Sequence, residues 1–348
     1  MLQNLLRGET RRSDAADPAW RWTYLSWLAV AVGGVYILSA KLSLSLLTPD
    51  GVAVFWPAAG VAAGALIAFG PRARWAVVAG TMIATIVANL MGDRNLVSSI
   101  VFALCNAGEA LLTAGLIERY FGSPFSLDRL RQVLGLLGAA IVAAAVSGVG
   151  GTLGFVLFHG ATESMFHLWQ NWFASDALGI VTIAPLVIGL ASAAREPPRP
   201  NQTIEGLTAL ALLIVMCVIA IAMPMEPWTT AVPIALLFPV LLWIAARCPP
   251  VFAAAAAFVV TLAIVWTTTI GIGRFGDASI PMADRVLAAR GGILAVALCA
   301  YVLAALFAAL RLRSLDINHA LVSGRRLYRQ IARLLAFKRT LGVTGHLS

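Results

Sequence analysis

A carboxylate lies inside an apolar stretch of this chain that is long enough to cross a membrane. This stretch is the expected span 168–191, and the sequence NWFASDALGIVTIAP (Asn171 to Pro185) within it carries Asp176. An Asp at the centre of a spanning helix costs about 2.5–3.5 kcal/mol on insertion scales, so intramembrane carboxylates usually face a bundle interior and take part in function. We therefore predict that Asp176 faces a polar site inside a helix bundle.

Other polar side chains fall within apolar segments at similar depths. Glu109 lies near the middle of its segment. Lys41 lies about six residues from the outer end of its own segment, or roughly 9 Å at 1.5 Å per residue. Amides at comparable depths are supplied by Asn89, Asn106 and Asn171. These residues predict a polar cavity in the outer half of the bundle, in which Lys41 either pairs with Asp176 or extends to the interface.

The alternative is that these polar groups only bond across helices and stabilise the bundle. Such interhelical bonds average about 0.6 kcal/mol in double-mutant cycles. That is a small return for burying carboxylates, so we expect functional roles for Asp176 and Glu109. Two further ionisable residues, Glu118 and Arg290, lie near the ends of apolar segments, and we expect both to extend to the interface.

Tryptophans stand at the outer ends of several apolar segments. Trp56, Trp169 and Trp172 are typical of an interfacial aromatic belt. Trp56 differs because Pro57 follows it, which fixes the local backbone and leaves carbonyl groups free at the predicted cavity mouth. Shortly after, Gly60 begins a G-x-x-x-G spacing, which either permits close helix contact or arises by chance in a glycine-rich chain.

The composition excludes a water-soluble domain. Of the 348 residues, 60% are hydrophobic and 12% charged, with a mean hydropathy of +0.87. Soluble domains contain about 25% charged residues, and each membrane span needs about 20 apolar residues. We predict an all-α, polytopic transmembrane helix bundle of ten spans, or eight if one pair is re-entrant. The expected spans are 23–47, 52–69, 74–91, 97–117, 133–157, 168–191, 205–223, 231–246, 251–270 and 287–310.

The charges of the loops predict the orientation. Arginines gather in alternate loops and at both chain ends, so the positive-inside rule predicts cytoplasmic termini and an even number of spans. The net charge of +9 is therefore a topology signal first, and we expect no nucleic-acid partner. We expect a basic cytoplasmic segment at 1–22 without a cleavable signal peptide, a membrane-embedded domain at 23–310, and a basic amphipathic tail at 311–348.

Soluble catalytic motifs are absent from the sequence. It contains no G-x-x-x-x-G-K-[ST] loop, no G-x-S-x-G elbow, no C-x-x-C pair and no H-E-x-x-H motif. The four cysteines, which fit neither a disulfide framework nor a zinc site, are Cys105, Cys217, Cys248 and Cys299. We therefore expect a protein that is not an enzyme and holds no cofactor or metal.

The tail has one weak heptad seam surrounded by basic residues. The seam consists of Ile317, Leu321, Gly324, Tyr328, Ile331 and Leu335. Two interpretations remain open, a basic helix lying on anionic lipid and a signalling helix that dimerises. The second interpretation predicts a homodimer through the last span and the tail. A tail of this length is too short to be a kinase or a cyclase.

Five segments carry motifs that are specific in combination. They are FWPAAG (55–60), GPRARW (70–75), NAGE (106–109), NWFASDALGIVTIAP (171–185) and LLWIAARCPP…TTTIGIGRFG (241–276). Over roughly residues 25–310 the chain resembles the first MASE family of membrane-associated sensor domains. Members are bacterial inner-membrane modules that usually precede histidine kinase, diguanylate cyclase, phosphodiesterase or PAS domains. The resemblance implies that the important residues are Trp56, Pro57, Gly60, Asn106, Glu109, Trp172, Asp176, Gly179 and Pro185.

The chain departs from this family pattern because no output domain follows the bundle in this sequence, which predicts either a separate signalling partner or a relic or fragment of a longer protein. We therefore expect a multi-pass sensor of the bacterial inner membrane. It would detect a small ligand or a partner membrane protein through the outward-facing cavity. It would relay this to a separate histidine kinase, diguanylate cyclase or permease. The alternative is a small-solute transporter, because midplane polar residues and broken spans are transporter traits as well. A third interpretation, a purely structural partner of a cytoplasmic kinase, predicts that Asp176→Asn leaves signalling unchanged.

Overall fold

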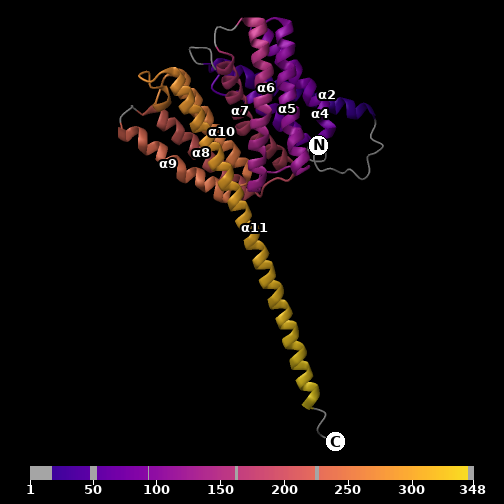
Figure 1. Cartoon of the computed structure of the whole chain (residues 1–348). Helices are drawn as coiled ribbons and strands as arrows, with labels where there is room; N and C mark the ends of the chain where they lie inside the picture. Colours follow the sequence, from indigo (N-terminus) through magenta and orange to yellow (C-terminus); the bar gives the residue numbers. More distant parts are fainter. Residues whose placement is uncertain (1–17, 48–52, 93, 161–163, 224–226, 344–348) are drawn as a thin grey trace.

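The chain forms a bundle of α-helices from which one helix projects far beyond the others (Figure 1). The computed structural model describes residues 18–47, 53–92, 94–160, 164–223 and 227–343. Within these ranges the regular elements are helices, and no β-strand is present. The predicted all-α, polytopic bundle is confirmed.

The helices follow one another along the chain with short connections. They are α2 (Pro18–Ser45), α3 (Pro57–Phe69), α4 (Arg74–Leu90), α5 (Leu96–Phe121), α6 (Leu130–His159), α7 (Met165–Arg195), α8 (Pro200–Ala222), α9 (Pro227–Arg247), α10 (Pro250–Ile270) and α11 (Met282–Val343). Two 3₁₀ turns, Pro71–Ala73 and Arg274–Gly276, lie between them.

Length and composition divide these helices into two groups. Eight stretches of the described residues are long and apolar enough to cross a membrane. Two shorter apolar helices accompany them, Pro57–Phe69 and Ala235–Arg247. The number of spans, ten or eight, stays a prediction. The side of the membrane on which each chain end lies stays a prediction as well.

The bundle contains two packed cores that meet at α7 and α10. The first is built mainly from α2 to α7 and is rich in alanine, with Ala62, Ala63 and Ala184 completely buried. Small side chains of this kind let membrane helices approach closely. The second core comes mainly from α8 to α11, and α10 packs against both α7 and α11. Helix α11 is therefore in contact with the helix that carries Asp176.

Helix α3 is shorter than the span predicted at 52–69. It has 13 residues and begins at Pro57, while residues 53–56 are not helical. Trp56 has φ −122° and ψ 84° because a proline disfavours helical dihedrals in the residue before it. The region predicted as the span 52–69 therefore consists of four non-helical residues followed by a short helix.

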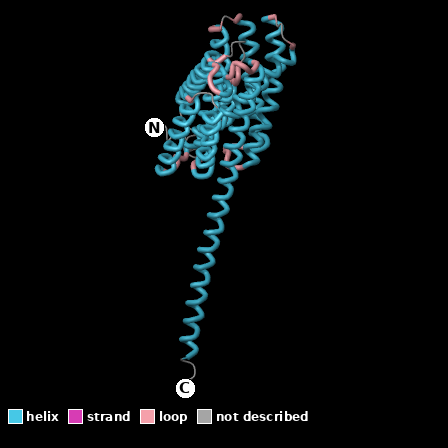
Figure 2. Tube along the Cα trace, turned by 90° about the vertical axis from the view of Figure 1, so that its left-hand side faces the viewer, coloured by secondary structure: helices cyan, strands magenta, loops and turns pink. Residues whose placement is uncertain are grey.

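Helix α11 runs for 62 residues and continues past Arg311 as a helix to Val343. Its second half projects away from the bundle in both views (Figures 1 and 2). Ile331, on this half, is 48% exposed. The other side chains of the predicted heptad seam lie outside the described residues, so the predicted homodimer stays a prediction.

Candidate functional site

An extended stretch, residues 53–56, lies within the bundle before α3 begins. In a membrane such backbone is tolerated only where the protein supplies hydrogen-bond partners or where it lines a cavity. Arg290 on α11 donates from Nη2 to Ala53 O at 2.9 Å and from Nε to Val54 O at 3.2 Å. Its third bond runs from Nη1 to Asn171 Oδ1 at 3.0 Å. Arg290 therefore points into the protein, and the expectation that it extends to the interface was wrong.

The rest of this stretch is held by two other helices. Ser43 Oγ on α2 donates to Phe55 O at 3.0 Å. Trp56 N donates to Ser175 O on α7 at 2.9 Å. Helices α2, α7 and α11 thus fix the position at which Trp56 enters the bundle.

A cavity of about 450 Å³ opens beside this stretch. Its walls include the ends of α4, α5, α6 and α7 that lie away from the projecting part of α11. Six of the predicted residues line it: Trp56, Asn89, Asn106, Asn171, Trp172 and Asp176. Its volume falls within the range of about 300–1,000 Å³ that is typical of small-molecule sites.

The two predicted carboxyl groups lie together at this cavity. Asp176 is 4% exposed and Glu109 is 3% exposed, and the two are close enough to interact electrostatically. Asp176 lines the cavity, whereas Glu109 lies behind its lining. Hydrogen-bond partners of ordinary geometry are lacking for Asp176 Oδ2 and for both Glu109 oxygens. Trp172 Nε1 and Thr152 Oγ1, which belong to lining residues, lack them as well. Buried polar groups are nearly always hydrogen-bonded, so this cluster calls for an explanation.

The amides of the cavity are held in place by neighbouring helices. Asn106 Nδ2 donates to the hydroxyl of the buried Tyr36 at 2.8 Å. Asn89 accepts from Arg94 Nη1 at 2.8 Å. The Arg94 guanidinium lies 5.2 Å from the ring centroid of Phe102, in cation–π contact. Arg94, Phe102 and Thr152 also line the cavity, although none belongs to the predicted set.

Lys41 stands apart from this site. Its side chain is exposed, and it forms no ion pair with the buried Asp176. At 3.6 residues per turn, Ala40 and Ser43 lie on the inward face of α2 and turn Lys41 outward. Of the two alternatives for Lys41, the ion pair with Asp176 is not formed, and extension to the interface fits the exposure of Lys41.

The predicted glycine and proline position the site through α3. Pro57 is buried at the start of α3, and Gly60 lies one turn later. A Cβ at Gly60 would collide with Gly179 O of α7, and a Cβ at Gly179 would collide with Trp56 O. These two glycines therefore allow α3 and α7 to touch through their backbones. Trp172 is placed in the same way, since its ring lies where a Cβ of Gly151 would be.

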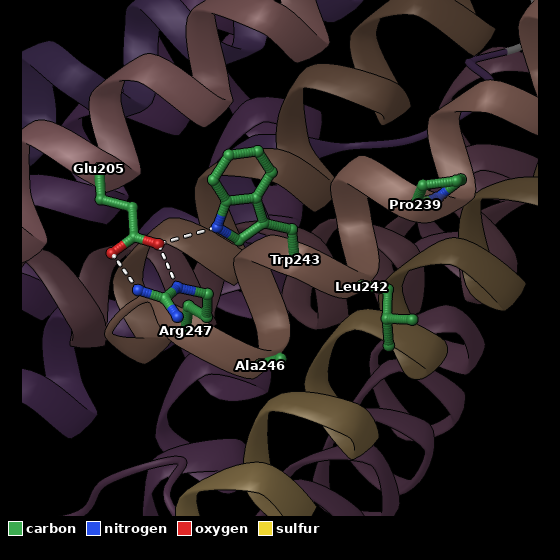
Figure 3. A pocket seen from close by; sticks show the side chains of 6 residues that line it. All are labelled: Glu205, Pro239, Leu242, Trp243, Ala246 and Arg247. Atoms are coloured by element: carbon green, nitrogen blue, oxygen red, sulfur yellow. Dashed lines mark hydrogen bonds and ion pairs between the residues drawn. The ribbon is translucent and has the colours of Figure 1, made fainter.

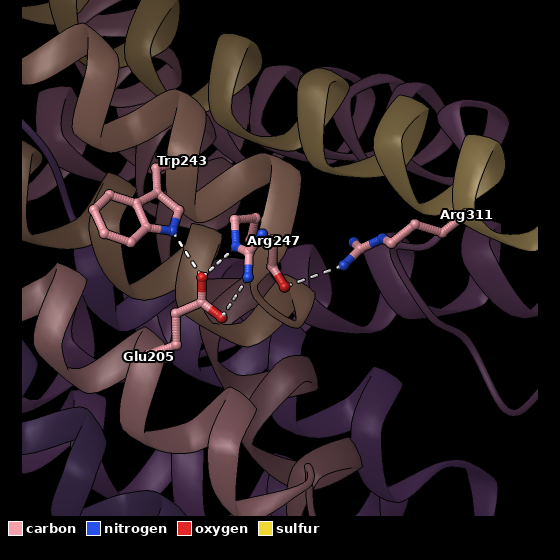
Figure 4. Close-up of polar contacts among 4 residues, drawn as sticks. All are labelled: Glu205, Trp243, Arg247 and Arg311. Atoms are coloured by element: carbon pink, nitrogen blue, oxygen red, sulfur yellow. Dashed lines mark hydrogen bonds and ion pairs between the residues drawn. The ribbon is translucent and has the colours of Figure 1, made fainter.

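A second polar cluster lies where α11 leaves the bundle (Figure 4). Glu205 on α8 forms an ion pair with Arg247 and accepts from Trp243 Nε1 at 2.8 Å. Arg311 Nη1 donates to Arg247 O at 3.2 Å. The cluster borders an open surface groove of about 550 Å³, along which Pro239 and Leu242 lie farther from the ion pair (Figure 3). It thus connects α8 and α9 to α11.

Glu118 also forms an ion pair, with Arg74 of the neighbouring helix α4. Its side chain is 23% exposed, which fits the expected position near the interface.

The fold and the cavity define a class, the polytopic helical membrane proteins with a ligand-sized internal cavity. The MASE1 family model matches residues 28–311, and the chain therefore belongs to the MASE1 family. This family is a membrane-associated sensory domain, which fits a protein that is not an enzyme. Comparison with curated proteins and with solved structures finds no match.

Proposed function

We propose that this chain senses a small ligand, or a partner membrane protein, through the cavity and relays the change through α11 to a separate cytoplasmic effector. Its family is sensory and its fold is a multi-pass bundle. One observation carries the proposal: Arg290 of α11 bonds to Asn171 and to Ala53, and both line the cavity. The helix that leaves the bundle is therefore bonded directly to the walls of the site.

The relay needs only two arrangements of the bundle and a ligand that binds them unequally. A ligand that moves α7 or residues 53–56 changes the acceptors of Arg290. A second bond joins the same helices farther along, from Tyr301 Oη to Thr182 O at 3.3 Å. Pro185 follows one turn later inside α7, and a proline interrupts the hydrogen-bond ladder and lets a helix bend. Bending of α7 at this point would move Thr182 relative to α11.

The cluster around Glu205 lies where α11 leaves the bundle. Arg311 bonds to the backbone of Arg247, which Glu205 in turn holds to α8. A shift of α11 along or around its axis would strain or release this cluster. In this proposal the projecting part of α11 is the signalling element. It continues the direction of a spanning helix, so it extends away from the membrane to where a separate effector can contact it.

The proposed setting is the bacterial inner membrane, with the cavity facing outward and both chain ends in the cytoplasm. The loop charges support this orientation through the positive-inside rule. The proposed effector is a histidine kinase, a diguanylate cyclase or a permease. A homodimer through α11 fits the same scheme.

One observation also favours a transporter. Residues 53–56 interrupt a potential span beside a polar cavity, and interrupted spans are typical of transporter binding sites. Net uptake of a solute by the purified protein in sealed vesicles would support transport. Binding without uptake would support sensing.

Co-purification tests the proposed relay. The full chain is isolated from native membranes in mild detergent, beside a matched chain that ends at Arg311. We expect a stoichiometric kinase, cyclase or permease with the full chain, and its loss from the shorter one. A protein that purifies without a partner would contradict the proposal.

A further inference from the structure

We infer that the cavity takes a small primary amine that also carries an oxygen acceptor, the chemistry of amino alcohols and amino acids. This inference rests on the proposed function and names the class of ligand. In it the ammonium group sits against Asp176, and the acceptor faces the N–H groups of the cavity wall.

The first reason is that two buried carboxyl groups lie at the cavity without a cationic partner among the described residues. Asp176 and Glu109 are buried side by side, and a buried charge without a partner is strongly unfavourable. The nearby cations are used elsewhere: Arg290 bonds to Asn171 and two carbonyls, and Arg94 bonds to Asn89. Neither arginine forms an ion pair with the two carboxyl groups. A cationic ligand would supply the missing charge.

The second reason is the pattern of polar atoms without partners. Asp176 Oδ2 and Thr152 Oγ1 are buried acceptors that belong to lining residues, and an ammonium group offers three N–H donors. Trp172 Nε1 is directed toward Asp176 but lacks an acceptor of ordinary geometry. A shared proton would neutralise one carboxylate, but it would leave Thr152 without a partner and the cavity unfilled. A ligand with both an ammonium group and an oxygen satisfies both kinds of group.

The third reason is the aromatic wall. The rings of Phe102 and Trp172 lie with centroids 5.4 Å apart, and Trp56 lines the same cavity. Aromatic faces attract organic cations. Metal ions of the Ca²⁺ type instead need about six oxygen ligands. The described residues contain no group of three or more metal-ligating side chains. The walls therefore favour an organic ammonium over a metal ion.

The test uses the full-length protein in maltoside detergent and follows its thermal unfolding with ethanolamine as the probe. Potassium chloride at equal ionic strength controls for salt. Choline controls for charge, because its quaternary nitrogen has no N–H donor. We expect ethanolamine to raise the unfolding midpoint in a saturable manner and to exceed both controls.

Substitutions locate the effect. A hydrogen bond to a charged group contributes about 1.5–3 kcal/mol, so Asp176→Asn should weaken the apparent affinity for ethanolamine at least about tenfold. Thr152→Val replaces one hydroxyl group by a methyl group and keeps the shape of the side chain. It therefore serves as the second variant if Asp176→Asn does not fold. It should weaken the affinity in the same direction. Glu118→Gln, which alters a carboxylate that neither lines the cavity nor restrains α11, should leave the affinity unchanged.

Three results would overturn the inference: no stabilisation of the native chain by ethanolamine beyond the salt control, an equal effect of choline, or full affinity in both cavity variants. None of these results removes the proposed function if α11 still responds to changes in the cavity. Conversely, an α11 that never responds would contradict the proposed function whatever the cavity binds.

Discussion

At the scale of single residues, the account depends on one arginine. Arg290 satisfies two carbonyl groups of the extended stretch and one cavity amide. Its bonds to Ala53 and Val54 join α11 to residues more than two hundred positions earlier in the chain. Its loss would leave acceptors without donors inside the membrane.

We predict that Arg290→Gln destabilises the protein by about 2–4 kcal/mol. Each buried polar group left without a partner costs about 1–3 kcal/mol, and the shorter amide replaces one bond at most. Thermal or denaturant unfolding in detergent measures the change. Lys41→Gln is the matched control, because Lys41 is exposed and should change the stability by less than about 0.5 kcal/mol. A larger effect at Lys41 than at Arg290 would contradict the placement of both side chains.

The positions of Lys41 and Arg290 show what a sequence leaves undetermined at this scale. Both are cations in apolar segments, and the sequence gives their depth but not the direction in which they point. Direction depends on how each helix is rotated against its neighbours. Asp176, Asn106 and Asn171 were easier to place, because buried polar groups on several helices favour a common cavity.

At the scale of elements, the contact between α3 and α7 positions the site. Gly60 and Gly179 let the two backbones touch, and this contact sets the position of Trp56 at the start of α3. The sequence predicted close packing at Gly60 only as one of two alternatives, because glycine spacings arise by chance in a glycine-rich chain. The short length of α3 was harder to predict, since its apolar run continues on both sides of Pro57.

We predict that Gly179→Ala disrupts the cavity and sharply lowers the yield of folded protein. The added methyl group would overlap the carbonyl oxygen of Trp56, and neither backbone can move without the other. Gly108→Ala is the matched control, because a Cβ there meets nothing within 4 Å. Size-exclusion profiles and unfolding midpoints of the two variants give the comparison. Equal behaviour of the two would refute the close contact.

The exit of α11 offers a second test at this scale. We predict that Glu205→Gln increases amide hydrogen exchange in the last turn of α9 and in α11 around Arg311, because Arg247 loses its ionic partner. Glu118→Gln breaks the Arg74 ion pair of α4 and α5 instead and serves as the control. Unchanged exchange near Arg311 in the Glu205 variant would show that the cluster does not restrain α11.

At the scale of the whole molecule, α11 connects the cavity to the side of the bundle from which this helix projects. It begins beside the cavity with Arg290, contacts α7 through Tyr301, and leaves the bundle at Arg311. Composition and the long apolar segments predicted the polytopic bundle, because soluble domains contain about 25% charged residues and this chain contains 12%. The continuous helix to Val343 was less certain, since a weak heptad seam fits both a surface helix and a projecting one.

The coupling between the cavity and α11 is the central claim, and a distance measurement tests it most directly. Spin labels at Arg72 and Arg313, both exposed, are introduced after the four native cysteines are replaced by alanine. Pulsed electron–electron double resonance then measures the distance between the two labels in the protein with the native cavity, in the Asp176→Asn variant, and in the variant that combines Asp176→Asn with Arg290→Gln. The account predicts that removing the buried charge shifts the distance distribution and that the added Arg290→Gln abolishes this shift. Identical distributions for the native cavity and for folded Asp176→Asn would contradict it.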